Sequence, residues 1–485
     1  MASFLSSQGW GTTARIFVAA AIAAGCGGGG DDNPPAPSSI QVLLRDGDTL
    51  PGGFFVNNVE SANMAADRSV AVIASESGTP ALNGVFVISA GGDVTTLMTP
   101  DNPPEGLALT TVRNLDMSST GEVTFEVGDQ LDSDGVFLYS NGQLSTLART
   151  NPGATPADFR ILGELALGPQ GMTAWTAGVS PCVVDSSSGN ERIECDLRLY
   201  TGLPGQVAPV AVPNGLESQA PTAVIISLNE NGEAAVGLPA SGSEPLVGLV
   251  RDGVFNGLLN RRQQFPGLGT LLSARPRAIG PTSDIVVDAG FDSDGDGQRD
   301  QNRVLLYSQA TIQSVAESGV PAPDHEGLQV LDVRGLDIDD AGRVIYSFDF
   351  GDPGSSTRFL SLRAWDGTSS QEIAFEPMRF GHDDQDEPLS ILEIEQIRVS
   401  RSGDVDFTAT NGRFEDGTRR IDREAILRWD PATAELTQVI ATKTELPDGN
   451  ITSLSIQDVN DTGDLLVIAS VVRSANRVLL LIPRT

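Results

Sequence analysis

Residues 229–237 read NENGEAAVG, a polar turn that leads into apolar residues. Similar turns recur along the chain as SSTGEVTF (118–125), DDAGRVIY (339–346), SRSGDVDF (400–407) and NDTGDLLV (460–467). Eight copies align on the fourth residue of the turn, which is Arg68, Gly121, Gly171, Gly232, Ser283, Gly342, Gly403 and Gly463. Neighbouring copies lie 50 to 61 residues apart. A period of this size predicts a chain built from copies of one structural unit.

Each copy contains four short apolar runs, which we interpret as four strands. In the second copy they are TVRNLDM (111–117), EVTFEV (122–127), GVFLYS (135–140) and QLSTLAR (143–149). Alternating and β-branched residues bounded by turn residues are typical of strands, and Asn141-Gly142 is a strong signal for a two-residue hairpin. The glycine of the first turn predicts a positive φ, which Arg68 and Ser283 would adopt at some strain or avoid with a different turn. No stretch has sustained helical periodicity, so the predicted fold class is all-β.

The last copy contains three strands instead of four. It begins at Ile451, whereas residues 39–53 (SIQVLLRDGDTLPGG) match the fourth strands of the other copies, including their proline-containing exits. An N-terminal strand that completes the last sheet would close a ring and protect its edges, whereas an open solenoid would need two caps. We therefore predict that residues 40–485 form one eight-bladed β-propeller of four-stranded antiparallel blades, with Val42 and Leu480 in the same sheet. A seven-bladed ring with one degenerate copy is the alternative.

The turns resemble those of bacterial exported tandem-repeat proteins, which carry an Asn-x-x-Gly-x-x-x-Phe signature and varied membrane anchors. Asn229 to Gly232 and Asn460 to Gly463 match the first half of this signature, and Phe125 and Phe407 match its last position. Several copies lack the Asn or the Phe, so the likeness is to a style of repeat that covers most of residues 40–485. The resemblance implies a propeller-like fold, and that family has no assigned chemistry to carry over.

The first 25 residues predict export. Arg15 precedes an apolar run at 16–24, which is far shorter than the ~20 residues that span a bilayer. Ala23-Ala24-Gly25-Cys26 resembles the bacterial lipobox, which implies that the Cys26 thiol is acylated; an ordinary secretory signal is the alternative. Residues 26–39, rich in glycine, proline and serine, predict a flexible tether. Because Gly27 differs from the aspartate that retains some lipoproteins at the inner membrane, we expect lipid anchoring at the bacterial outer membrane or cell surface.

Acidic residues outnumber basic ones by 64 to 31, which gives a formal net charge of −33, and Lys443 is the single lysine. Such a surface repels nucleic acid and anionic lipid headgroups and favours cations or basic partners, although it can also serve solubility alone. We expect no nucleic-acid partner, contact with the membrane only through the N-terminal lipid, and a monomer. Cys182 and Cys195 are close in sequence, and in an oxidising compartment such a pair predicts a structural disulfide.

Long connections between strands indicate where a ligand would bind. The turns between first and second strands are short, whereas the connections at the opposite end of each unit vary widely and include 180–195, 290–302, 376–388 and 411–424. Irregular loops on a rigid scaffold often carry binding residues. We therefore predict an unknown protein or glycan ligand on this long-loop face.

Residues 292–300 (DSDGDGQRD) form the most specific local motif. Their spacing places several carboxylates and one main-chain carbonyl around Ca²⁺, which prefers hard oxygen ligands. The predicted ligands are Asp292, Asp294, Asp296, Gln298 and Asp300. The motif resembles the calcium loops of dockerins and integrin-type propellers, but its twelfth position is Arg303 where an EF-hand has Glu, which excludes a full EF-hand. We predict a structural calcium ion that stiffens the loop; a solvated acidic loop without metal is the alternative.

An enzyme is the alternative class of function. His325 and His382 lie in acidic connections, where histidine with carboxylates could hold Zn²⁺ or Mn²⁺, but their spacing fits no known ligand pattern and favours two exposed side chains. The chain has no Gly-x-Ser-x-Gly elbow or phosphate-binding loop, whereas a carboxylate pair for glycoside hydrolysis would converge only in space. Trp175, Trp365 and Trp429 are predicted to pack between blades. We favour a binding or scaffolding protein over an enzyme that acts on envelope or extracellular glycans, or a metal-dependent hydrolase.

Overall fold

The computed structural model describes residues 40–484 with internal gaps. The gaps are 77–82, 105–110, 129–132, 150–158, 186–191, 204–205, 207, 211–223, 239–244, 384–386, 416–417, 448 and 473–475. The predicted signal peptide and tether, with Cys26, lie outside the described residues, so export and acylation stay predictions. Within the described part, no helix has the length and apolar character needed to cross a bilayer.

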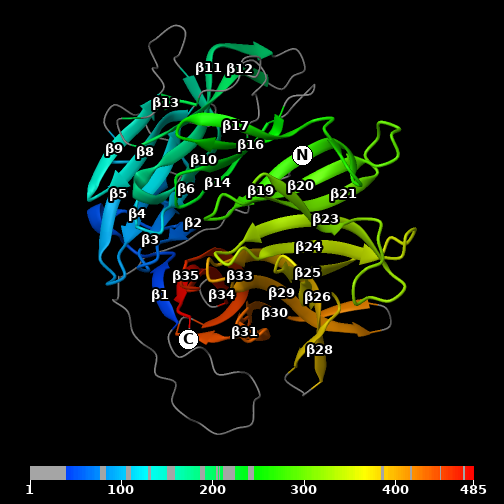
Figure 1. Ribbon diagram of the computed structural model, residues 1–485. Coiled ribbons are helices and arrows are strands. Elements are labelled where there is room, and N and C mark those ends of the chain that lie inside the picture. Colours follow the sequence, from blue (N-terminus) through cyan, green and yellow to red (C-terminus); the bar gives the residue numbers. More distant parts are fainter. Residues whose placement is uncertain are drawn as a thin grey trace.

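Eight antiparallel sheets form a closed ring around a central axis (Figure 1). The innermost strands are β2 (Asn58–Met64), β6 (Thr111–Met117), β10 (Phe159–Leu167), β14 (Val224–Leu228), β19 (Gly269–Ile279), β23 (Gln329–Ile338), β28 (Pro388–Val399) and β33 (Gly449–Val459). Each innermost strand contacts the innermost strand of the next sheet, and β33 contacts β2. The predicted eight-bladed β-propeller is therefore confirmed, and the seven-bladed alternative is wrong.

Three further strands complete each blade. The second strands are β3 (Val70–Ser75), β7 (Val123–Gly128), β11 (Thr173–Asp185), β15 (Ala234–Gly237), β20 (Ile285–Asp292), β24 (Val344–Gly351), β29 (Val405–Glu415) and β34 (Leu465–Val471). The third strands are β4 (Asn83–Ile88), β8 (Ser133–Ser140), β12 (Arg192–Gly202), β16 (Pro245–Arg251), β21 (Gln301–Ser308), β25 (Phe359–Trp365), β30 (Thr418–Asp430) and β35 (Asn476–Ile482). The outermost strands are β5 (Val94–Met98), β9 (Gln143–Arg149), β13 (Ala208–Pro209), β17 (Val254–Asn260), β22 (Thr311–Glu317), β26 (Ser370–Phe375), β31 (Glu435–Ala441) and β1 (Gln41–Arg45).

Short elements precede several innermost strands. The two- to four-residue strands β18 (Gln264–Phe265), β27 (Arg379–His382) and β32 (Glu445–Leu446) pair with β19, β28 and β33. Two single 3₁₀ turns, η1 (Pro51–Gly53) and η2 (Pro169–Gly171), are the helical segments in the described part of the chain. The regular structure is otherwise all strand, as the sequence predicts.

The N-terminal strand closes the ring. β1 pairs antiparallel with β35, and Val42 lies opposite Leu480. On its other side Leu480 faces Val467 of β34, so one sheet holds strands from both ends of the chain. In Figure 1 the blue β1 lies beside the red β35. The predicted completion of the last blade by residues near 40 is confirmed.

The hydrophobic core lies between the blades. One cluster joins Ile345 of the sixth blade to Phe407 and Leu427 of the seventh, and another joins Val59 of the first blade to Leu479 of the eighth. Burial of one such side chain stabilises the fold by about 1.5–3 kcal/mol. Each second strand lies between the first and third strands of its blade, and its residues are buried on both faces of the sheet. The three tryptophans predicted to pack between blades are 1–8% exposed, which agrees with this role: Trp175, Trp365 and Trp429.

The repeated turn keeps two features in all eight blades, although the third turn differs in having a second positive φ at Gln170. The N–H of its first residue donates to the carbonyl of its fifth residue at 2.7–3.1 Å. The fourth residue has a φ between 67° and 91°, including Arg68 and Ser283. A three-residue hairpin loop that ends in the left-handed region has this form, and glycine reaches it with little strain. The predicted positive φ is confirmed, and the two exceptions keep the same turn.

The fourth residue of several turns also packs against the preceding blade. A Cβ on Gly403 would lie 2.2 Å from Arg343 Nη2, and one on Gly463 would lie 2.4 Å from Asp404 Oδ2, whereas Gly121 and Gly342 have open space. Where the fourth residue is Arg68, its Nε donates to Asp464 Oδ2 of the eighth blade at 2.7 Å. Ser283 Oγ donates in the same way to Glu233 of the fourth blade. Both turns without glycine therefore contact the preceding blade through the side chain of the fourth residue.

The ring has two distinct faces. The turn face carries the first-to-second and third-to-fourth turns, and the loop face carries the second-to-third connections and the connections between blades. On the loop face, the stretches 180–195 and 411–424 were expected to be loops, and this expectation is wrong. They belong mostly to the long paired strands β11 and β12, and β29 and β30. Alternating side chains allow these strands to continue past the ring as hairpins.

Candidate functional site

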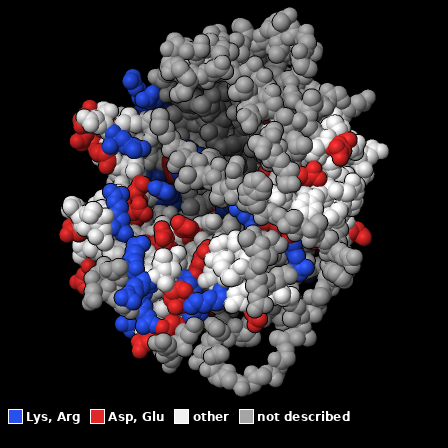
Figure 2. All heavy atoms as spheres, turned by 180° about the vertical axis from the view of Figure 1, so that it is seen from behind, with Lys and Arg blue, Asp and Glu red and all other residues white. Residues whose placement is uncertain are grey.

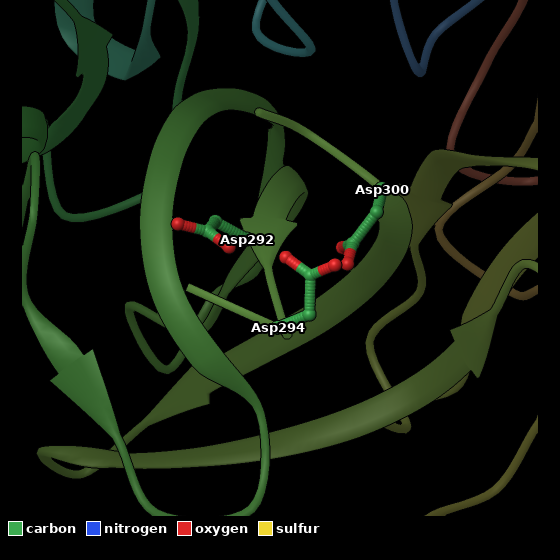
Figure 3. A group of neighbouring side chains, drawn as sticks. All are labelled: Asp292, Asp294 and Asp300. Atoms are coloured by element: carbon green, nitrogen blue, oxygen red, sulfur yellow. The ribbon is translucent and has the colours of Figure 1, made fainter. Parts of the chain in front are cut away.

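The predicted calcium loop connects β20 to β21 on the loop face of the fifth blade. β20 ends at Asp292, and Phe291 pairs with Gln301 at the start of β21. One carboxylate oxygen from each of Asp292, Asp294 and Asp300 lies within 4.8 Å of the others. Figure 3 shows the carboxylates of Asp294 and Asp300 turned toward each other. The fold therefore brings together three of the five predicted ligands.

Hydrogen bonds hold this loop in shape. The two carboxylate oxygens of Asp292 accept from the N–H groups of Gly295 and Gly297 at 2.6 and 2.9 Å. Both glycines have positive φ and open space around them. Asp300 accepts from Ser293 Oγ at 2.6 Å, and this hydrogen bond lowers the pKa of the Asp300 carboxyl. Asp292 is buried whereas Asp294 and Asp300 are exposed, so the group opens toward solvent.

Two predicted features lie outside the three-carboxylate group. Asp296 Oδ1 accepts from the Gln298 N–H at 2.7 Å, and the Asp296 carboxylate is not part of the group. The twelfth position, Arg303, lies within β21 and pairs with Glu317 of β22. This cation is directed to the neighbouring strand, which is consistent with the exclusion of an EF-hand.

The two histidines do not form a metal centre. His325 stacks on Phe350 with ring centroids 4.0 Å apart, and its Nε2 lies 2.9 Å from Glu372 Oε1. Its side chain is 9% exposed, so the expectation of an exposed residue is wrong for His325. His382 is exposed at the end of β27. Among the described residues, neither histidine belongs to a group close enough to share an ion.

Cys182 and Cys195 lie on the paired strands β11 and β12. Val183 lies opposite Glu194, but the register shifts between Val179 and Val183, and Cys182 lies in this irregular segment. The two side chains lie outside the described residues, so the disulfide stays a prediction.

A cavity of about 150 Å³ opens on the turn face. Its walls come from the innermost strands and first turns of six blades, from the first to the fourth and the seventh and eighth. The apolar part is formed by Met64, Met117, Leu167 and Leu228, and the polar part includes Asp458, Asp461 and Arg401. The long, variable connections of the sequence point to the loop face, so this cavity on the turn face was not predicted.

An ion pair crosses the mouth of this cavity. Arg401, the second residue of the seventh turn, pairs with Glu230, the second residue of the fourth turn. The Arg401 Nε also lies 3.0 Å from Asp461 Oδ1 in the adjacent eighth turn. Because the fourth and seventh blades are three blades apart, the Arg401 side chain reaches across the axis. A signal was present in the sequence, since the second turn position is charged in four copies: Glu230, Asp340, Arg401 and Asp461.

Three half-buried aspartates lie just below the turns. Asp116, Asp337 and Asp458 each precede the first residue of a turn by two positions. Asp116 Oδ2 accepts from the Leu167 N–H and Asp458 Oδ2 from the Met64 N–H, both at 2.8 Å and both from the next blade. Burial raises the pKa of Asp116 to about 7 and those of Asp337 and Asp458 to about 6. These carboxyls therefore titrate close to neutral pH.

The ring of eight sheets, closed by the N-terminal strand, defines the chain as a β-propeller. The sequence matches no protein-family profile, and comparison with curated proteins finds no match. Its structure is similar to the Dos1 propeller, with a TM-score of 0.42 and 12% identity over 87% of this chain and 92% of that one.

Two further solved structures share the architecture. The WD40 domain of SCAP from fission yeast has a TM-score of 0.42 and 10% identity over 91% of this chain and 97% of that one. An oligogalacturonate lyase in complex with manganese has a TM-score of 0.41 and 9% identity over 98% of this chain and 99% of that one. At these values the likenesses carry no residue role and no activity to this chain.

Proposed function

We propose that this chain is a lipid-anchored propeller of the bacterial cell envelope that binds a protein or glycan ligand on its loop face. Calcium stiffens the 292–300 loop of that face. The observation that carries the proposal is the start of β1 at the turn face, on the opposite side of the ring from the variable connections. An anchor joined to the ring there would leave the loop face free. The ligand surface then points away from the membrane.

The strand order determines the face of the ring at which the chain enters β1. Gln41 lies opposite Leu481, so the chain enters β1 beside the end of β35. That end is at the turn face, because the Arg484 N–H donates to Asp464 Oδ1 of the eighth turn at 2.8 Å. The tether at 26–39 therefore joins the ring at the turn face. A flexible tether of this length spans roughly 20 Å on average, which would keep the ring close to the bilayer.

The hairpin of β29 and β30 supports a ligand surface on the loop face. Ile421 is 70% exposed at this hairpin, next to the exposed Arg419 and Arg420. An exposed apolar side chain beside two cations gives the hairpin groups that a ligand could contact. Figure 2 shows the molecule from behind the view of Figure 1, where lysine and arginine side chains lie mostly along one flank, interleaved with acidic ones.

The test of the ligand surface compares the two faces. Purified protein is incubated with isolated envelope glycans and envelope proteins, and the bound fraction is measured for the variant Arg419→Ser/Arg420→Ser. We expect the double substitution to reduce binding at least about tenfold, which corresponds to about 1.4 kcal/mol. The matched control is Arg251→Ser, which removes a partly exposed arginine from the turn face. Equal binding by both variants would refute the placement of the ligand on the loop face.

The calcium test measures protein stability, because a bound cation would relieve the mutual repulsion of the three carboxylates. An ion that binds only the folded state raises stability by about 2.7 kcal/mol at 100 times its dissociation constant. We expect calcium to raise the melting temperature of the protein and Asp294→Ala to abolish that rise. Glu445→Ala, which removes an exposed carboxylate far from the loop in sequence, serves as the control. A melting temperature that calcium leaves unchanged in the native protein would remove the metal from the proposal.

The anchor has its own test. Cells grown with a fatty-acid analogue should label the native protein, and Cys26→Ser should abolish the label because the acylated thiol is gone. Persistence of the label in the variant would show that the lipid is attached elsewhere, or that the lipobox interpretation is wrong.

A further inference from the structure

The loop face carries two exposed aliphatic side chains on neighbouring blades. Among the described residues, the large hydrophobic side chains that are exposed are Ile421 at 70%, Val472 at 62% and Val254 at 46%. Ile421 lies in the hairpin of β29 and β30 in the seventh blade, and Val472 directly follows β34 in the eighth. Val254 begins β17 at the turn face. Two of the three therefore lie on the loop face, on blades that adjoin.

A path of hydrogen bonds connects the two loop-face positions. Lys443 Nζ lies 3.5 Å from Oδ1 of Asp422, the residue that follows Ile421. The Lys443 N–H donates at 2.8 Å to a carbonyl of β33, and the Val472 N–H donates at 3.0 Å to the carbonyl of Asn450 in the same strand. The two aliphatic side chains thus belong to one continuous surface across the boundary of the two blades. We call it the junction surface, made of residues 419–422, Lys443, Asn450 and Val472.

Exposed cations flank the apolar side chains of this surface. Arg419 and Arg420 precede Ile421 and are exposed, whereas the Asp422 carboxylate is paired with Arg423 at 3.0 Å. Residues 411–424 contain four arginines and four acidic residues, although acidic residues outnumber basic ones by 64 to 31 in the whole chain. The junction surface is therefore a cationic and apolar region on an acidic protein, and its charge complements an acidic partner.

The kinds of exposed side chain favour a protein partner over a glycan. Sugar rings stack on aromatic faces, and none of the Phe, Tyr and Trp side chains with a described exposure is exposed. Ile421 and Val472 are aliphatic, and they release water when a second aliphatic side chain covers them. A partner that gains from this surface must bring apolar groups together with its carboxylates, and protein side chains supply both.

We propose that the loop-face ligand is an acidic protein, which binds the junction surface through a segment that combines aliphatic and acidic side chains. This inference rests on the loop-face ligand of the proposed function and narrows it to one class. The aliphatic side chains of the partner cover Ile421 and Val472, and its carboxylates pair with Arg419 and Arg420.

The first test uses short synthetic probes of equal charge. One peptide contains leucine and glutamate in equal numbers, a second replaces the leucines with serine, and an oligomer of glucuronic acid is the glycan probe. Fluorescence anisotropy should show the leucine peptide binding at least about tenfold more tightly than either of the others, because it alone covers the aliphatic side chains. Equal affinities of the two peptides, or tightest binding of the sugar, would overturn the proposal.

The second test removes the aliphatic side chains from the protein. Ile421→Ser/Val472→Ser should weaken binding of the leucine peptide at least about fivefold, since both apolar contacts are lost. Val254→Ser is the matched control, because it removes the exposed aliphatic side chain of the turn face and should leave the affinity unchanged. Melting curves verify that both variants fold. An unchanged affinity in the double variant, or an equal loss in the control, would contradict the proposal.

A comparison with the arginine variant separates this inference from the proposed function. If Arg419→Ser/Arg420→Ser reduces binding of envelope material and Ile421→Ser/Val472→Ser does not, the loop face holds its ligand by charge alone; this inference then fails and the proposed function stands. If neither variant reduces binding, both fail. A native dimer that Ile421→Ser/Val472→Ser dissociates would assign the junction surface to a second copy of this chain and would also refute the inference.

Discussion

The two faces of the propeller are built from the same eight units and differ in how strictly they repeat. On the turn face every unit has a five-residue turn closed by the same hydrogen bond from its first to its fifth residue, and several turns contact the preceding blade. On the loop face the connections range from a tight acidic loop at 292–300 to the extended hairpin of β29 and β30. Contacts between blades thus constrain one face, and the other is free to vary.

The contacts of the turn face also include the end of the chain. Arg484 Nη2 donates to Asp404 Oδ1 in the seventh turn at 2.9 Å, and the Arg484 N–H donates to Asp464 in the eighth. Arg68 of the first turn bonds to the same Asp464. The charges therefore connect the seventh, eighth and first blades, where the ring closes.

The largest effect is expected at the turn-face end of the seventh blade. Asp406 is fully buried and accepts two hydrogen bonds from Arg428 at 2.8 and 2.9 Å. Asp406→Ala leaves the Arg428 cation buried without this partner and should lower the free energy of unfolding by about 3–5 kcal/mol. Urea denaturation measures this change. The double variant Asp406→Leu/Arg428→Met is the control, and its free energy of unfolding should fall much less because neither charge remains. An equal decrease in both variants would mean that packing, not charge, dominates.

The half-buried aspartates predict an unusual pH dependence. The folded-state pKa of Asp337 is about 6 against 3.8 for an unperturbed aspartate, so the folded state binds the proton more tightly. Its contribution to stability is then present below pH 4 and is lost as pH rises to about 6. Relative to the native protein, Asp337→Asn should reduce the difference in unfolding free energy between pH 4 and pH 7 by about 2 kcal/mol.

A carboxylate of the loop face provides the opposite case. The pKa of Asp300 is lowered, so its contribution is present above the unfolded-state pKa and is lost as pH falls below it. In calcium-free buffer, Asp300→Asn should therefore change the pH dependence of the unfolding free energy with the sign opposite to that expected for Asp337→Asn. Identical changes in Asp337→Asn and Asp300→Asn would contradict the assigned burial of Asp337.

Glycine substitutions compare the faces directly. Gly403 and Gly297 both have positive φ, but a Cβ would meet Arg343 at Gly403 and open space at Gly297. Gly403→Ala should cost about 1–3 kcal/mol, and Gly297→Ala should cost about 1 kcal/mol, which is the backbone strain alone. Thermal denaturation in calcium-free buffer measures both. A larger loss of stability in Gly297→Ala than in Gly403→Ala would contradict the expectation that the turn face is the more constrained of the two.

The smallest effect on stability is expected at the tip of the seventh-blade hairpin. Arg419 and Arg420 are exposed, so Arg419→Ser/Arg420→Ser should change the free energy of unfolding by no more than about 0.5 kcal/mol, although the same variant is expected to lose ligand. A loss of several kcal/mol would show that the hairpin is structural.

Local signals in the sequence were enough for the scaffold. The turn motif predicted the number of blades and the positive φ of the turn glycine, because that geometry depends on the five residues of the turn, but it left open whether Arg68 and Ser283 keep the same turn. The strand-like run near Val42 predicted the closure, because a sheet one strand short needs a partner. The carboxylate spacing predicted three neighbouring ligands in the calcium loop, whereas Asp296 lies outside the group because its side chain caps the Gln298 N–H.

Contacts between distant residues were not predictable in this way. Arg401 and Glu230 are 171 residues apart and meet only because the ring brings their turns to one mouth. His325 is buried because the connection before β23 folds against Phe350 and Glu372, which no local pattern indicates. Pairing across the axis and between blades depends on the completed ring.

The most direct test of the closed ring is a disulfide between its first and last strands. Val42 and Leu480 are opposed partners in an antiparallel pair, so Val42→Cys/Leu480→Cys should form a bond within one molecule under mild oxidation. Mass spectrometry of the digested monomer should then recover a peptide that joins residues 42 and 480. Recovery of only unlinked peptides, or of links between two molecules, would contradict the closure on which the opposition of the two faces depends.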